Sequence, residues 1–120
     1  MTIVKMEELN EEAVDLIAAA SVWKPASVKD EPHTRLTSWK VMLVGERYVH
    51  FVGYTGHEGR VCSVVQTYDS KTKRGITRSG RIYELVGPSG NNSDAQYVWA
   101  HWLEINGLTS EDARDISEEY

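Results

Sequence analysis

The sequence predicts an α+β fold in which helices cover one face of a twisted antiparallel sheet. Residues 35–86 contain five segments with strand periodicity, joined by short connections that favour antiparallel neighbours, and an amphipathic helix with clear ends follows them. We expect a five-stranded meander that could curl toward a small open barrel. The chain of 120 residues is long enough to form one domain, residues 1–120, with a substantial hydrophobic core.

An N-terminal helix is predicted over residues 11–22. Asn10 is a suitable N-cap, and the acidic residues that follow it interact favourably with the helix dipole. The apolar positions of this segment carry mostly small side chains, which suits close packing against the sheet. Because the residue before Pro25 is disfavoured in helical conformations, the helix should end there, and a polar connector should lead to the first strand.

The sheet is predicted from runs of alternating or β-branched and aromatic residues that are separated by turn-forming residues. Ser79 and Gly80 form a tight turn between the last two runs, which therefore make a hairpin. The five expected strands are residues 35–44, 48–54, 60–68, 75–78 and 81–86.

A second helix is predicted over residues 94–105. Ser93 with Gln96 resembles a capping box, and Asn106 with Gly107 supplies a C-terminal stop. Helical spacing places one apolar stripe toward the sheet, made of Ala95, Val98, Trp99, Trp102 and Ile105. A short acidic helix should follow and extend to about residue 117.

We expect a soluble, cytoplasmic protein. The first residues show no basic region followed by a long apolar stretch, and no apolar run reaches membrane-spanning length. The single cysteine, Cys62, excludes an internal disulfide and is expected in the core. The formal net charge of -5 makes nucleic acid an improbable partner, but it leaves room for a local anion site.

The main candidate for such a site is a basic segment that no acidic residue interrupts: Lys71, Lys73, Arg74, Arg78 and Arg81. Arg78 and Arg81 flank the predicted hairpin turn and could present two guanidinium groups to one phosphate or carboxylate. Charge on turns and edge strands also commonly serves to keep a sheet soluble, and this is the more frequent explanation. The glycine-rich residues 87–93 resemble a phosphate-binding loop, but an ordinary strand-to-helix connection explains them.

A second candidate is an apolar pocket lined by Trp39, Trp99 and Trp102, with His50 or His101 available for acid-base chemistry. Large indole rings are equally expected in a core. The histidines and Cys62 do not have the spacing of a metal site, and no cofactor motif is present, so the sequence does not favour an enzyme.

Residues 76–108 resemble the C-terminal part of small uncharacterised bacterial proteins of the kind found in integron gene cassettes and other mobile DNA. The resemblance lies in Thr77–Gly87, Asp94–Trp99 and Ile105–Gly107. It implies a bacterial accessory protein and carries no known activity.

Three hypotheses of function follow. The first is a non-enzymatic binding protein that uses the basic hairpin or an aromatic surface, with an acidic protein or a second copy of itself as partner. The second is a small-ligand pocket or weak acid-base enzyme enclosed by the tryptophans. The third is single-stranded nucleic-acid binding, which would depend strongly on salt because phosphate contacts release counterions.

Overall fold

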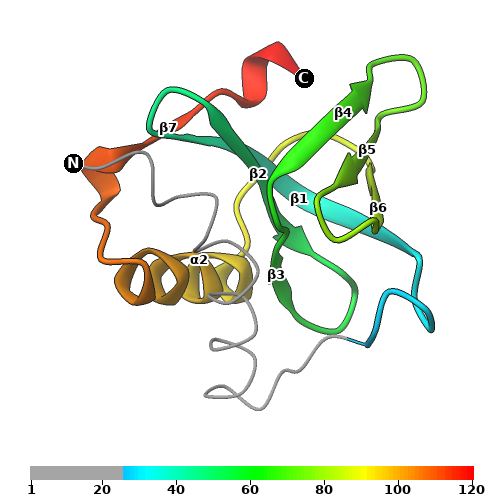
Figure 1. Ribbon diagram of the computed structural model, residues 1–120, viewed down its shortest axis with the longest axis horizontal. Helices are drawn as coiled ribbons and strands as arrows, with labels where there is room; N and C mark the ends of the chain where they lie inside the picture. The colour runs from blue at the N-terminus through cyan, green and yellow to red at the C-terminus, as the bar shows by residue number, and fades with distance from the viewer. Residues whose placement is uncertain (1–25) are drawn as a thin grey trace.

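A computed structural model describes residues 26–120, which form a bent mixed sheet with one helix packed against part of it (Figure 1). The predicted helix over residues 11–22 lies outside the described residues. Seven strands make the sheet: β1 (His33–Val44), β2 (Tyr48–Tyr54), β3 (Gly59–Val61), β4 (Val65–Asp69), β5 (Arg74–Thr77), β6 (Ile82–Leu85) and β7 (Ala113–Asp115). The helix is α2 (Ser93–Ile105), and single 3-10 turns η2 (Ser110–Asp112) and η3 (Ser117–Glu119) flank β7.

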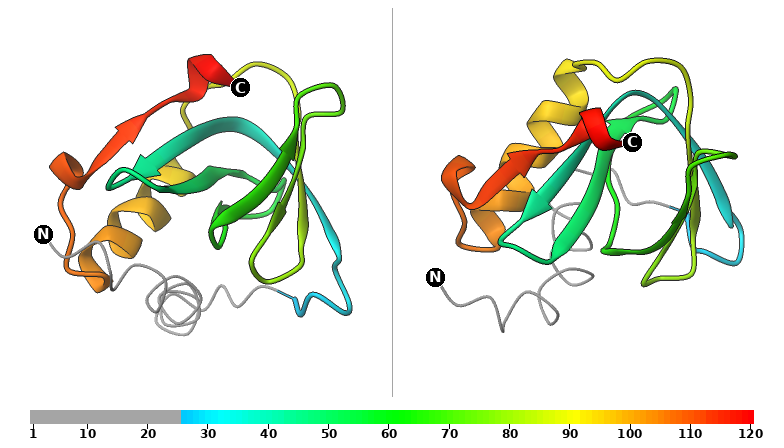
Figure 2. Two further views of the ribbon diagram at one scale, coloured as in Figure 1. Left: turned by 45° about the horizontal axis from the view of Figure 1, so that its top comes forward. Right: turned by 90° about the horizontal axis from the view of Figure 1, so that it is seen from above.

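The long strand β1 belongs to both halves of the sheet. Its first residues pair with β6, whereas its last residues lie between β2 and β7. The two halves meet at a bulge between Thr37 and Lys40, where Ser38 has a φ of 45°. A bulge bends a strand and increases its twist, so β1 arches from one half to the other (Figure 2).

The strand order β3-β2-β1-β6-β5-β4 corrects the predicted meander. β1 and β6 run parallel, with His33 opposite Ile82 and Leu36 opposite Leu85, so the sheet is mixed rather than antiparallel. It is also open rather than closed into a barrel. The meander was wrong because β5 and β6 return as a hairpin to the free edge of β1, a pairing that connection lengths do not reveal.

Two further predictions about elements were wrong. The expected strand over residues 60–68 is divided into β3 and β4, because Cys62 to Val64 turn the chain from one half of the sheet to the other. The expected acidic helix after residue 108 is replaced by η2, β7 and η3. In β7, Arg114 pairs with Leu43 of β1, so edge pairing with β1 overrides the weak helical tendency of an acidic segment.

The helix α2 confirms the predicted range of 94–105 and differs in detail. Its N-cap is Asn92 rather than Ser93, because the Asn92 side-chain oxygen accepts a hydrogen bond from Ala95 N at 2.9 Å. The helix ends at Asn106, followed by Gly107 with a φ of 69°. Its buried stripe contains Leu103 in place of the expected Ile105, which is 38% exposed.

Two apolar clusters stabilise the sheet. The first lies between α2 and the half formed by β2 and β3, and it contains both tryptophans of α2. The second lies inside the bend, where β1, β2, β5 and β6 surround Phe51, Leu36 and Tyr83. Gly75 has room for no side chain there, since a Cβ would lie 2.7 Å from the Phe51 ring. Both faces of β2 are therefore buried, one in each cluster.

Candidate functional site: the outer face of the sheet

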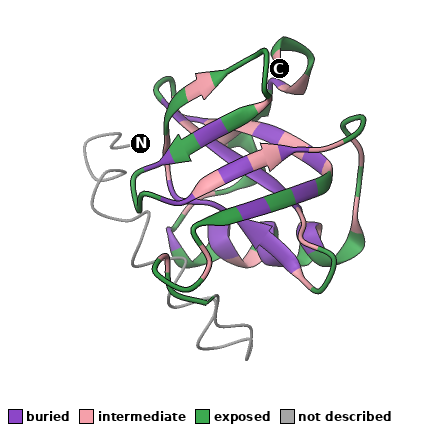
Figure 3. Ribbon diagram, turned by 90° about the vertical axis from the view of Figure 1, so that its right-hand side faces the viewer, coloured by how far each residue is buried: buried purple, intermediate pink, exposed green. Residues whose placement is uncertain are grey.

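The strands β6, β5, β4 and the first part of β1 form a surface that we call the outer face. In β5, in β6 and in the first part of β1, buried side chains alternate with more exposed ones, so that one face packs on the second cluster and the other meets solvent (Figure 3). The helix α2 lies on the side of β2 and β3, away from β4, β5 and β6 (Figure 1). The outer face is therefore the solvent side of a sheet half that α2 does not cover.

Two rows of side chains cross the outer face from strand to strand, and each row consists of residues that lie opposite one another on neighbouring strands. The first row runs His33, Ile82, Ile76 and Thr67. The second row runs Arg35, Glu84, Arg74 and Asp69. Directly opposed residues on neighbouring strands have their Cβ atoms about 5 Å apart, so each row is a continuous line of interacting side chains. The first row is partly apolar, with Ile76 44% exposed, and the second alternates in charge.

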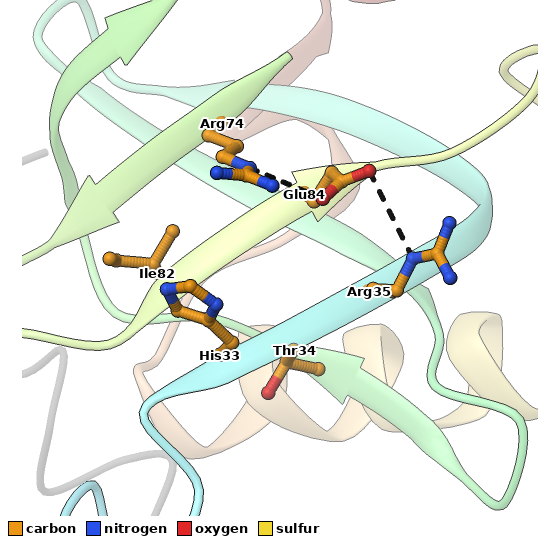
Figure 4. A pocket seen from close by; sticks show the side chains of 6 residues that line it. All are labelled: His33, Thr34, Arg35, Arg74, Ile82 and Glu84. Carbon is orange, nitrogen blue, oxygen red and sulfur yellow. Dashed lines mark hydrogen bonds and ion pairs between the residues drawn. The ribbon is translucent and has the colours of Figure 1, made fainter. Parts of the chain in front are cut away.

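Glu84 lies between two arginines in the second row. Arg74 Nε donates to Glu84 Oε1 at 3.2 Å, and Arg35 Nε lies 3.9 Å from Glu84 Oε2 (Figure 4). The arginine side chains are 51% and 71% exposed, respectively. Solvent screening makes such pairs weak contributors to stability. Both contacts with Glu84 are made by Nε, and each guanidinium group has four further N–H donors on its two Nη atoms.

A shallow depression of about 480 Å³ lies at this point of the outer face. Its lining residues are His33, Thr34, Arg35, Arg74, Ile82 and Glu84 (Figure 4). The depression combines cationic groups, one imidazole and the apolar side chain of Ile82. It is suited to a ligand that carries a carboxylate or phosphate beside an apolar group.

The structure brings together only some of the basic residues that the sequence singled out. Lys71 and Lys73 lie in the turn between β4 and β5, next to Arg74 and at one end of the charged row. Arg78 follows β5 at the opposite end of that strand. Lys71, Lys73 and Arg74 therefore extend the positive charge of Arg35, whereas Arg78 lies apart from them.

Arg81 points away from the outer face. It is 6% exposed, and its Nη2 donates to Ala26 O at 2.6 Å while its Nη1 donates to Glu31 O at 2.7 Å. Arg81 thus holds the segment before β1 against the sheet. Arg78 and Arg81 do not present their guanidinium groups to one ligand in this structure.

The three tryptophans of the predicted pocket lie in two different clusters. Trp39 is in the second cluster, where its Nε1 donates to Gly87 O at 2.9 Å. Trp99 and Trp102 stack in the first cluster with ring centroids 5.2 Å apart. All three are less than 9% exposed, which is the burial of core residues.

The two histidines predicted as acid-base candidates both pack against other parts of the protein. His50 is fully buried, and burial lowers its pKa to about 4, against the opposing effect of its hydrogen bond to Cys62 O. His101 packs its ring on Tyr97 of α2 at 4.4 Å between centroids.

The glycine-rich connection, residues 87–93, makes a backbone hydrogen bond to β1, since Gly90 N donates to Trp39 O at 3.0 Å.

Comparisons with known proteins gave no significant match: neither the protein-family models, nor the curated proteins, nor the solved structures contain one. Residues 26–120 contain no helix that is long and apolar enough to cross a membrane. In the same part of the chain, no three histidine, cysteine or acidic residues are grouped in a way that could hold a metal ion. The candidate site therefore rests on its own geometry.

Sequence reasoning missed Arg35, Glu84 and His33. Strand periodicity could place Arg35 and Glu84 on exposed faces of their own strands. Their contact depends on the parallel register of β1 and β6, in which Arg35 lies opposite Glu84. A separation of 49 positions gives no local signal for that pairing.

Proposed function

We propose that this chain is a non-enzymatic binding protein that captures an acidic segment of a partner protein on its outer face. The observation that carries the proposal is the placement of Arg35 and Arg74 on either side of Glu84, on a half of the sheet that α2 leaves uncovered. The hydrogen bond to Glu84 orients the guanidinium group of Arg74, and an oriented arginine loses less entropy when it binds a carboxylate.

The charge of the region supports an acidic partner. Arg35, Arg74, Lys71 and Lys73 are cationic, and only Glu84 and Asp69 oppose them within the two rows and the adjoining turn. The whole chain carries a formal net charge of -5, so this positive region stands out against an acidic background. Such a local field steers an acidic segment to one place on the protein.

The first row supplies apolar contact beside the charge. Ile82 and Ile76 lie two residues along their strands from Glu84 and Arg74, which corresponds to about 7 Å. A partner segment with an apolar side chain next to its carboxylates would fit both rows. This combination favours a protein segment over an inorganic anion, because the apolar row adds area that an ion cannot use.

The positions of two tyrosines favour a protein partner over single-stranded nucleic acid. Base stacking needs exposed aromatic rings beside the positive charge. Tyr68 and Tyr83 are the aromatic residues nearest to the basic segment, and both pack in the second cluster inside the bend. The rings that could have served as platforms face away from the outer face.

The proposal is tested with the full chain and a fluorescent peptide of glutamates interrupted by leucines. Fluorescence anisotropy at low salt measures the dissociation constant for the wild-type protein and for the double variant Arg35→Glu/Arg74→Glu. We expect the double variant to bind at least about 10-fold more weakly, which corresponds to about 1.4 kcal/mol. Binding should also weaken as salt rises, because the charges are exposed.

The matched control is Arg47→Glu/Arg114→Glu, which changes the net charge by the same amount at exposed positions outside the outer face. It should alter the dissociation constant by less than about 2-fold. Equal losses in the two double variants would show that only net charge matters, and they would refute a site on the outer face.

We also propose a cytoplasmic location, an origin in mobile DNA and a homodimeric state. A cytoplasmic location fits a chain whose only cysteine is buried and reduced. An origin in mobile DNA rests on the sequence resemblance alone. A homodimer stays a proposal too, and light scattering of the purified protein would test it.

A further inference from the structure

Two buried arginines converge on one carboxylate at the edge of the described region. Arg60 comes from β3, Arg81 from the loop between β5 and β6, and Glu31 from the segment just before β1. The side chains of Arg60 and Arg81 are 5% and 7% exposed, whereas that of Glu31 is 37% exposed. This cluster is independent of the outer face, where the arginines are exposed.

The carboxylate of Glu31 fits the two guanidinium groups poorly. Its contact atom for both is Oε2, which lies 3.3 Å from Arg81 Nη1 and 3.9 Å from Arg60 Nη2. Charge-assisted hydrogen bonds of this kind are usually about 2.7–2.9 Å long. Glu58 Oε1 is also distant, at 3.6 Å from Arg60 Nη2.

The hydrogen-bond donors of Arg60 are incompletely used. Its Nη1 donates to Tyr83 Oη at 3.3 Å, but its buried Nε has no hydrogen-bond partner among residues 26–120. Removing a guanidinium group from water is costly unless its donors are satisfied, so an orphaned donor in a buried arginine requires an explanation. One explanation is a ligand whose oxygens fit the two guanidinium groups better than the Glu31 carboxylate does.

We infer that Arg60 and Arg81 form a binding site for a phosphate-type oxyanion, and that Glu31 closes this site from within the chain. A tetrahedral oxyanion offers separate oxygens to the two guanidinium groups, which a single Oε2 does not. Arg81 is already held in place by its bonds to Ala26 O and Glu31 O. It can therefore receive a ligand without further ordering of its side chain.

The charges of the cluster support the replacement of the Glu31 carboxylate by an oxyanion. Arg60 and Arg81 are balanced by Glu31 and Glu58 while Glu31 occupies the site. When the partly exposed Glu31 side chain turns out to solvent, a net positive charge is left between buried groups. An entering oxyanion restores the balance, and the tethered Glu31 competes with it as an internal carboxylate.

A purely structural role for Glu31 makes a different prediction. In both cases the loss of Glu31 leaves two buried arginines poorly paired, which destabilises the fold. Only the site predicts that an external oxyanion then replaces the lost carboxylate. Rescue of stability by phosphate therefore separates the two explanations.

The test compares thermal unfolding of the wild-type chain and the Glu31→Gln variant in sodium phosphate, sodium acetate and sodium chloride at equal ionic strength and neutral pH. In chloride the variant should unfold at a lower temperature than the wild type. In about 20 mM phosphate its midpoint should rise by about 4 °C or more, against about 1 °C for the wild type, because binding to the folded state adds stability. A smaller rise in acetate would show that the tetrahedral ion is preferred to a carboxylate.

The Glu46→Gln variant is the control, since Glu46 is exposed and lies away from both arginines. It should respond to phosphate as the wild type does, which corrects for the general stabilising effect of this salt. In Glu31→Gln/Arg60→Gln the phosphate response should return to the level of the wild type. Equal responses of the wild type and Glu31→Gln overturn the inference.

The outcome is decisive even if Glu31→Gln does not fold in chloride. Circular dichroism would then follow whether phosphate restores the folded state. Refolding in phosphate and not in chloride supports the site, and failure in both overturns it.

Discussion

The imidazole of His50 lies against the indole of Trp102, with ring centroids 4.7 Å apart and ring planes at 55°. Both side chains are fully buried. His50 Nδ1 lies 2.9 Å from Cys62 O, and because a carbonyl oxygen only accepts hydrogen bonds, Nδ1 carries the proton of the neutral ring. Burial lowers the pKa of His50 to about 4, so the ring stays neutral in the folded protein at ordinary pH.

This pKa makes the protein sensitive to acid in a defined range. Between its ordinary pKa of 6.5 and the folded value of about 4, His50 gains a proton in the unfolded chain and not in the folded one. The contribution of neutral His50 is fully present above about pH 6.5 and is lost as the pH falls toward 4. The loss by pH 4 is about 3 kcal/mol in the free energy of unfolding.

Urea unfolding of the wild type and of His50→Gln at about pH 7 and about pH 4.5 measures this effect. We expect the variant to be less stable at neutral pH, because the imidazole packing is lost, but also less sensitive to the change in pH. The exposed His57 is the control, and His57→Gln should keep the wild-type dependence. An unchanged pH dependence in His50→Gln would contradict the assignment to this residue.

Gly59 is expected to tolerate no side chain. A Cβ at this position would lie 2.4 Å from the carbonyl carbon of Asp94, in the first turn of α2, and backbone atoms cannot move aside as a side chain can. Gly59→Ala should therefore cost about 2 kcal/mol or more of the free energy of unfolding, as overpacking typically does. Chemical denaturation measures it. Gly90→Ala is the control, because a Cβ there meets Ser38 at an ordinary 3.4 Å, and a similar cost in both variants would contradict the predicted clash.

Arg81 and Arg78 should differ sharply in their effect on stability. Arg81→Gln removes donors from Ala26 O and Glu31 O, and we expect a loss of about 2 kcal/mol or more. Arg78→Gln replaces an exposed side chain, whose interactions are screened by solvent, and should cost less than about 1 kcal/mol. Thermal and urea unfolding of the two variants would test this, and a large loss in Arg78→Gln would contradict it.

Cys62 should be unreactive in the folded protein. It is 1% exposed, and burial raises the pKa of its thiol to about 12, so very little thiolate is present. The thiolate is the reactive species, and at about pH 8 we expect a disulfide reagent to react at least about 1,000-fold more slowly than with the chain in urea. Following the reaction by absorbance measures both rates. Fast labelling in native buffer would show that the second cluster opens readily at this point.

Local signals identified the elements better than their arrangement. The stop at Asn106 and Gly107 and the apolar stripe with Trp99 and Trp102 follow from spacing within one helix, and the structure confirms them. The hairpin of β5 and β6 is likewise present, around a turn in which Gly80 has a φ of 92°. Each of these depends on residues only a few positions apart.

The parallel pairing of β1 with β6 depends instead on residues far apart in the chain. No turn residue and no periodic pattern in the sequence indicates that His33 lies opposite Ile82. The same is true of the bulge at Ser38. The same limit applies to the candidate site. Arg74 and Arg81 were predicted to belong to one site because they are close in the chain. In the structure Arg74 lies on the exposed surface of the sheet, whereas Arg81 lies in a buried cluster.

The shared strand β1 also constrains how the protein is made. During synthesis β2 follows β1 at once, but the two strands that pair with the other edge of β1 come much later, since β6 begins at Ile82 and β7 at Ala113. One edge of β1 therefore remains unpaired until most of the chain has emerged, and an unpaired edge is a template for association with other chains. Chaperone binding to nascent chains that expose residues 1–81 or residues 1–115 outside the ribosome should report the moment at which that edge closes.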